Sequence, residues 1–139
     1  MTTTNGIPML TPLVAPFVNA AGKIQNIFEA SPDDPPARGV AVIHSKAGSR
    51  RSSHWHKKDW HVLYVLSGRM LYTERRIGSG TIVKFTVNPG EAVFTGSRVE
   101  HWTSFDEDTI MVSVSSLSRQ HAEHEADLVR VDWLDGEPT

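Results

Sequence analysis

Turn signals divide most of this 139-residue chain into short apolar stretches, and their regular spacing restricts the fold more than any other feature. The turns are marked by Ala47-Gly48, Ser67-Gly68, Gly78-Ser79-Gly80 and Asn88-Pro89-Gly90. The stretches between them are long enough for β-strands and too short for ordinary helices. Many short strands with little helix predict an all-β protein, built as an antiparallel barrel or sandwich.

A chain of this length is the size of one domain, and we find no internal repeat. We expect strands at residues 23–29, 38–45, around His54, and at 60–66, 70–76, 81–87, 92–95, 102–105 and 109–115. One short helix is expected at 119–126, and residues 128–133 can return as a closing strand. The predicted organisation is an N-terminal arm at residues 1–22, one barrel at 23–134 and a disordered tail at 135–139.

Three prolines interrupt the apolar N-terminal segment and exclude a regular helix there: Pro8, Pro12 and Pro16. The segment is too hydrophobic to remain in water, so we expect an extended arm on the barrel surface or across a second subunit. It also lacks the basic start of a signal peptide and the unbroken apolar run of a membrane span. We therefore expect a cytoplasmic protein.

The charge balance gives no indication of a polyanionic partner. Charged residues make up 22% of the chain and the formal net charge is -2, so we expect neither nucleic acid nor an acidic membrane surface as partner. The chain has no cysteine, which excludes disulfides and thiolate metal sites and agrees with a reducing compartment.

Three histidines lie close together in the stretch from Gly48 to Gly68. His54 and His56 are two residues apart in an expected strand, so their side chains share a face with Cα atoms about 6.6 Å apart. A short polar turn then brings His61 back on the neighbouring strand. The best candidate for a further ligand is His101, and the sequence predicts one metal ion held by these four imidazoles.

The spacing of these residues has a precedent. Gly48 is followed by five residues, His54-x-His56, four residues, His61, six residues and Gly68. This pattern resembles the first motif of the cupin superfamily, in which the position of His61 is usually a glutamate.

The second cupin motif matches only in outline. Counting from Gly90 places His101 on the histidine of that motif. Three other positions depart from the usual proline, glycine and asparagine: Gly96, Arg98 and Phe105. The two motifs together cover about half of the chain, which resembles a small single-domain, RmlC-like cupin with a four-histidine variant of the metal motif.

The resemblance implies a double-stranded β-helix, also called a jelly-roll barrel, that often forms a homodimer and binds a divalent metal in its mouth. The matching residues would be its ligands. Imidazole suits Fe, Mn, Ni, Zn or Cu without selecting sharply among them. Four neutral ligands would leave the ion its full charge, so that it polarises bound oxygen atoms and attracts anions.

Three functions remain open. The first is a metal-dependent enzyme acting on a small, oxygen-rich organic substrate as a dioxygenase, decarboxylase, isomerase or lyase. In the second, the run from Arg51 to Lys58 resembles the Arg-Gly-Gly-His-x-His-Lys run of sugar-nucleotide ketoisomerases, which implies that His54 and His56 carry protons without a metal. The third is a non-enzymatic barrel that binds or senses a small molecule.

The remaining polar residues offer weaker candidates, and the sequence identifies no catalytic residue outside the metal site. Three side chains are candidates for contacts with a ligand: Tyr64, Tyr72 and Arg98. Tyr64 is also typical of packing on the outer face. We interpret His44 as a core or interface residue, and His121 and His124 as part of a solvated helix face because glutamates flank them.

Overall fold

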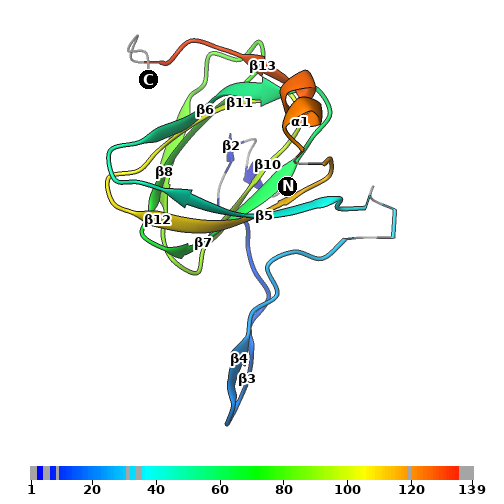
Figure 1. The fold of residues 1–139 in the computed structure, drawn as a ribbon, viewed down its shortest axis with the longest axis vertical. Helices are drawn as coiled ribbons and strands as arrows, with labels where there is room; N and C mark the ends of the chain where they lie inside the picture. Colours follow the sequence, from blue (N-terminus) through cyan, green and yellow to red (C-terminus); the bar gives the residue numbers. More distant parts are fainter. Residues whose placement is uncertain are drawn as a thin grey trace.

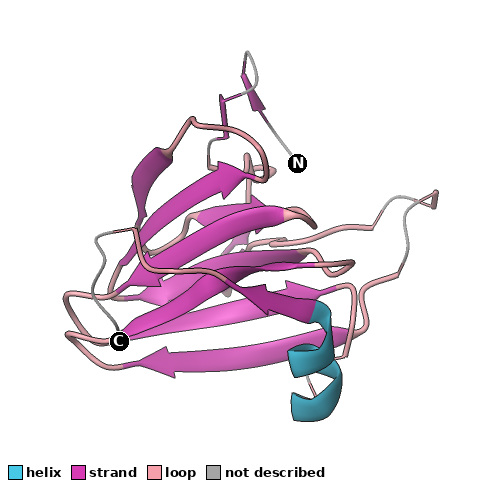
Figure 2. Ribbon diagram, turned by 90° about the horizontal axis from the view of Figure 1, so that it is seen from above, coloured by secondary structure: helices cyan, strands magenta, loops and turns pink. Residues whose placement is uncertain are grey.

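The computed structural model describes residues 3–4, 7–8, 10–30, 32–33, 36–118 and 120–134. Two antiparallel sheets lie face to face and enclose the core (Figure 1). Figure 2 shows from above that strands form nearly the whole barrel and that the helix lies at one end of it. The expected all-β jelly-roll barrel with at most one short helix is confirmed.

The first sheet has the order β10-β7-β12-β5, formed by β5 (Gly39–Ser45), β7 (His61–Ser67), β10 (Ala92–Thr95) and β12 (Thr109–Ser115). The second has the order β13-β6-β11-β8-β9, formed by β6 (Arg50–His56), β8 (Met70–Arg76), β9 (Val83–Val87), β11 (Val99–Ser104) and β13 (Leu128–Arg130). The helix α1 (His121–Asp127) precedes β13, and two small hairpins near the N-terminus comprise β1 (Thr3–Thr4) with β2 (Ile7–Pro8) and β3 (Phe17–Asn19) with β4 (Gly22–Ile24).

The strands expected at 70–76, 92–95 and 109–115 agree with β8, β10 and β12. The strand expected at 23–29 is wrong, because β4 ends at Ile24 and pairs only with β3. Beyond it, Ile27 and Phe28 are anchored by side-chain packing on the barrel instead of by a strand ladder. The tail predicted at 135–139 and Arg119, the first residue of the expected helix, lie outside the described residues.

Apolar side chains from both sheets fill the space between them. Fully or almost fully buried examples are Val65, Met70, Tyr72, Phe105 and Met111. The pleat alternates sides, so that each strand sends every second side chain inward. Gly68 lets the chain turn tightly from β7 to β8: its φ is 82°, and an added Cβ would collide with the backbone that leads into β12.

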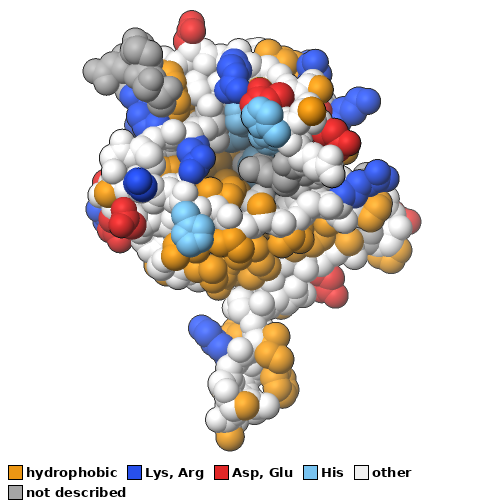
Figure 3. Space-filling view, viewed as in Figure 1, with side chains coloured by type: hydrophobic (Ala, Val, Ile, Leu, Met, Phe, Trp, Pro, Cys, Tyr) orange, Lys and Arg blue, Asp and Glu red, His pale blue; other side chains and the backbone are white. Residues whose placement is uncertain are grey.

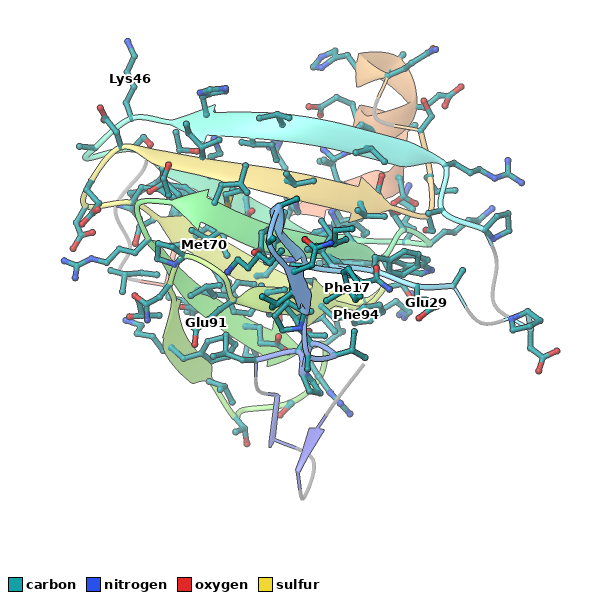
Figure 4. The ribbon with its side chains drawn as sticks, turned by 90° about the horizontal axis from the view of Figure 1, so that it is seen from below. Phe17, Glu29, Lys46, Met70, Glu91 and Phe94 are labelled. Carbon is teal, nitrogen blue, oxygen red and sulfur yellow. The ribbon has the colours of Figure 1, made fainter. Side chains whose placement is uncertain are left out.

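The N-terminal segment covers part of the outer face of the first sheet. The backbone N–H of Thr11 donates to the carbonyl of Ala92 at 2.8 Å, and Leu13 packs near Val62. The β3–β4 hairpin then extends away from the barrel (Figure 1), and Figure 4 shows from below the face from which it extends. Three of its apolar side chains are exposed by 62%, 67% and 69%: Phe17, Val18 and Ile24.

None of the helical residues that the structure describes forms a segment long and apolar enough to cross a bilayer.

Candidate active site

Three strands and the helix bring five histidines to one cavity of about 460 Å³ between the sheets. They come from β6, β7, β11 and α1: His54, His56, His61, His101 and His124. Figure 3 shows histidine side chains at the edge of the opening between the two sheets. The four predicted ligands therefore converge, and their role as metal ligands stays a prediction.

Three of the four predicted ligands form a tight group. His54, His56 and His101 each offer a nitrogen within 4.8 Å of the others. The ring centroid of His61 lies 5.2 Å from that of His101 and 5.4 Å from that of His56, which places it in the cavity wall but outside this set. Nδ1 of His54 and Nε2 of His101 are buried and have no hydrogen-bond partner among the described residues. Such nitrogen atoms fit a transition metal or a polar group of a ligand.

Hydrogen bonds fix the orientation of two of the rings. Nδ1–H of His101 donates to the carbonyl of Val99 at 3.0 Å, so its Nε2 faces the cavity. Nδ1–H of His56 donates to the buried carboxylate of Asp127 at 3.2 Å, which likewise turns Nε2 of His56 toward the cavity. The backbone N–H groups of Lys58 and Asp59 also donate to Asp127, at 3.0 and 3.1 Å, so this carboxylate is held firmly.

Burial sets the protonation of the inner rings. It lowers the pKa of His54 to about 2, and the neighbouring imidazoles of His101 and His56 add to the effect. Burial also lowers the pKa of His101 to about 3, against the opposing influence of its hydrogen bond to Val99. Both side chains are therefore neutral near pH 7, as metal ligands and neutral hydrogen-bond partners must be.

A β-bulge directs His54 into the cavity. His101 pairs with His54, whereas the next residue, Trp102, pairs with Ser52, so Ser53 is an extra residue in β6. Ser52 and Ser53 have φ values of 72° and 69°, which favour glycine and cost other residues about 1 kcal/mol each.

Sequence reasoning missed a second buried polar group beside the histidines. The hydroxyl of Tyr72 donates to Oε1 of Glu74 at 2.8 Å and shares a hydrogen bond of 2.7 Å with Thr95. Glu74 is 1% exposed and pairs with His101 across the ladder between β8 and β11. Burial raises the pKa of Glu74, which favours its neutral form. The alternation that directs Met70 and Tyr72 inward was the signal that could have found it.

Two of the weaker candidates for ligand contacts lie outside the cavity, and one histidine of the helix lies inside it. Tyr64 packs on the outer face, and the guanidinium of Arg98 lies 5.2 Å from the ring centroid of Trp55; neither lines the cavity. His121 is exposed, as expected. The interpretation of His124 as part of a solvated face was wrong, because it is half-buried and lines the cavity.

The cavity is lined by imidazole side chains and one guanidinium. Among the described residues it includes Arg51 and no carboxylate, together with the five histidines named above and a sixth, His44 of β5, which is exposed and is therefore not a core residue. The guanidinium of Arg51 donates to Ser45 Oγ at 2.8 Å and to the carbonyl of His44 at 2.9 Å, which fixes it near the mouth. This lining suits an anionic or oxygen-rich ligand.

The family model described as "Cupin domain" matches residues 41–116, more than half of the chain. The protein belongs to the cupin family. No curated protein matches the sequence of this cupin. Its α1 and β13 lie beyond the matched residues, so Asp127 and His124 come from a segment outside the family match.

Solved structures resemble this cupin in fold. The sugar 3,4-ketoisomerase QdtA from Thermoanaerobacterium thermosaccharolyticum, in complex with TDP, has a TM-score of 0.70 at 18% identity, covering 91% of this chain and 90% of QdtA. The 3'-monoepimerase ChmJ from Streptomyces bikiniensis, in complex with dTDP-quinovose, has a TM-score of 0.72 at 20% identity, covering 89% and 69%. The dTDP-4-dehydrorhamnose 3,5-epimerase from Sulfolobus tokodaii has a TM-score of 0.68 at 19% identity, covering 89% and 76%.

Proposed function

We propose that this cupin isomerises or epimerises a nucleotide-linked sugar, with His56 as the main proton carrier and His54 beside it. The hydrogen bond between His56 and the buried carboxylate of Asp127 is the observation that carries the proposal. The names of the structural neighbours, a sugar ketoisomerase and two sugar epimerases, support the same class of reaction. So does the resemblance of the run from Arg51 to Lys58 to that of sugar-nucleotide ketoisomerases.

An epimerase removes a proton from a carbon atom next to a carbonyl group and replaces it on the other face of that carbon. A ketoisomerase moves the proton to the neighbouring carbon. Nε2 of His56 removes the proton, and the electron pair of the broken C–H bond forms an enolate or enediolate. In an isomerisation the imidazolium of His56 returns the proton to the neighbouring carbon. In an epimerisation a water molecule on the opposite face donates a proton to the same carbon, and His56 releases its own proton to solvent. Asp127 accepts Nδ1–H of His56 at 3.2 Å and stabilises the imidazolium that forms.

The neutral rings have different tasks. His54, with its pKa held at about 2, cannot store a proton, but a neutral imidazole can donate a hydrogen bond to the developing enolate oxygen. His101 already donates Nδ1–H to Val99, so its Nε2 is an acceptor for a sugar hydroxyl. His56 is therefore the base, and His54 and His101 orient the sugar.

The length of the cavity suits a ligand with a charged end. Arg51 and His56 are five residues apart on β6, which is at most about 16 Å at 3.3 Å per residue and less with the bulge at Ser53. Two N–H groups of Arg51 hold it to β5, and its other donors can bind a diphosphate. The diphosphate would lie near Arg51 and the sugar near His56.

The test is turnover of a TDP-linked 4-keto sugar in deuterium oxide, followed by NMR. We expect deuterium at the carbon next to the carbonyl group, unchanged activity after dialysis against EDTA, and a loss of 10²–10⁴-fold in His56→Ala. Loss of activity on chelation would contradict the proposal. Tight binding without any exchange would instead favour the sensing barrel.

A metal-dependent enzyme acting on an oxygen-rich substrate is the second candidate, favoured by the nitrogen atoms of His54, His56 and His101 within 4.8 Å of one another. These residues would hold the ion, with His61 beside them. The ion would supply a Lewis acid that polarises a ligand oxygen. Element analysis of untagged protein, with His101→Ala as the comparison, tests this candidate: stoichiometric Fe, Mn, Ni, Zn or Cu in the wild type would support it.

We also propose a homodimer. The β3–β4 hairpin extends from the barrel with Phe17, Val18 and Ile24 exposed, and an isolated two-stranded hairpin is marginally stable in water. A second subunit would cover these side chains. Light scattering tests this: a full chain with the mass of one subunit would contradict the homodimer, and a protein lacking residues 1–20 that stays soluble with an unchanged number of subunits would contradict the hairpin as its contact.

A further inference from the structure

The short helix α1 approaches His56 with two side chains. Asp127, its last residue, binds Nδ1 of His56 at 3.2 Å. His124, nearly one turn earlier, places its ring centroid 5.5 Å from that of His56 and 6.3 Å from that of His54. One helix therefore orients His56 through Asp127 and lines the cavity beside His56 with His124.

The end of α1 that carries these residues is anchored on both sides. The backbone N–H of Lys57 donates to the carbonyl of Asp127 at 2.8 Å, and β13 continues directly as a strand paired with β6, with Leu128 opposite His56. At the other end, Gln120 makes no side-chain capping bond and His121 is exposed. His124 is the middle residue of the helix and its backbone N–H donates to the carbonyl of Gln120 at 2.9 Å, so the helical backbone connects its position to the anchored residue Asp127.

The cavity has different chemistry at its two ends. The guanidinium of Arg51 lies at one end of β6, and the rings of His56 and His124 lie at the other. We infer, resting on the proposed function, that His124 is a specificity-determining residue that contacts the sugar and not the nucleotide. Its imidazole hydrogen-bonds a sugar hydroxyl or carbonyl beside the carbon from which His56 removes the proton.

Calorimetric binding of two probes, TDP and TDP-glucose, tests this assignment. We expect His124→Ala to weaken binding of TDP-glucose about tenfold, the usual effect of one hydrogen bond, and to leave TDP binding unchanged. His124→Gln should recover part of the loss, and His121→Ala on the same helix should change neither affinity. An equal loss for both probes, or no loss for either, would overturn the inference. A wild type that binds neither probe would overturn the proposed function and this assignment with it.

A second measurement needs no nucleotide and separates the two failures. Diethyl pyrocarbonate acylates accessible imidazoles, and mass spectrometry gives the rate at each histidine. If His124 lies over the cavity, His124→Ala should speed acylation of His54 and His56 severalfold relative to His121→Ala. Equal rates in the two variants would overturn the position of His124, whatever the protein binds.

Discussion

The interior of the barrel has two unlike ends, although the same strands form both. Along β7, His61 lies at one end and Val65 at the other; along β11 the chain runs from His101 to Phe105 just beyond the strand. The apolar end is close-packed and the histidine end surrounds a cavity of about 460 Å³. Stability and chemistry are therefore separated along the strands. A substitution at the apolar end should mainly lower stability, and one at the histidine end should mainly lower activity.

Phe105→Ala should give the largest effect, at the apolar end. The ring is 2% exposed, and removing it should lower the free energy of unfolding by about 4 kcal/mol through lost burial and a cavity. Urea denaturation measures this. Leu71→Ala, on the outer face of β8 with 36% exposure, is the control and should cost well under half as much. Equal losses of stability in the two variants would show that the apolar end is not the main source of stability.

Asp127→Asn should give the next effect, at the histidine end. The amide keeps the size of the carboxylate but no longer stabilises the imidazolium of His56, so turnover of the nucleotide-linked sugar should fall about 10–100-fold. The amide nitrogen cannot accept the N–H bonds of Lys58 or Asp59, so the melting temperature should fall as well, by less than in Phe105→Ala. Glu125→Gln is the control, because Glu125 pairs with Arg130 on the surface. A variant with full activity would refute the role of Asp127.

Ser52→Gly and Ser53→Gly, at the bulge in β6, should stabilise the protein instead of destabilising it. Both residues occupy the left-handed region, with φ of 72° and 69°, so glycine at Ser52 should raise the free energy of unfolding by about 1 kcal/mol. The gain at Ser53 should be smaller, because its hydroxyl donates to the carbonyl of Val131 at 2.6 Å and glycine removes that bond. In extended β11, Ser104→Gly should instead destabilise. Destabilisation by all three changes would show that the bulge is not strained.

Glu74→Gln should give the smallest effect, and a pH-dependent one. Burial raises the pKa of Glu74 in the folded state above its usual value, so stability is fully present below that usual value and is lost as the pH rises through the folded pKa. Glutamine cannot ionise, so the variant should melt higher than the wild type at pH 8 and no higher near pH 4. Exposed Glu123→Gln should show no such difference. A pH-independent shift would contradict the buried neutral carboxyl.

Patterns within short stretches of the sequence predict much of the fold and part of the candidate site. Alternation and turn glycines locate β8, β10 and β12, and the spacing of His54 and His56 places both in the cavity. Asp127 could not be found in this way, because it reaches His56 across 71 residues and its acidic helix looks solvated in the sequence. The pairing of β13 with β6, together with the bonds from Lys58 and Asp59 to Asp127, holds that end of α1 against the barrel.

The central claim is that His56, held by Asp127, exchanges a proton with a carbon of a nucleotide-linked sugar. NMR of a TDP-linked 4-keto sugar in deuterium oxide with the chelator-treated protein tests it most directly. The account predicts deuterium at the carbon next to the carbonyl group with the wild type and almost none with His56→Ala. Equal exchange with both proteins, or exchange only after a metal is restored, would contradict it.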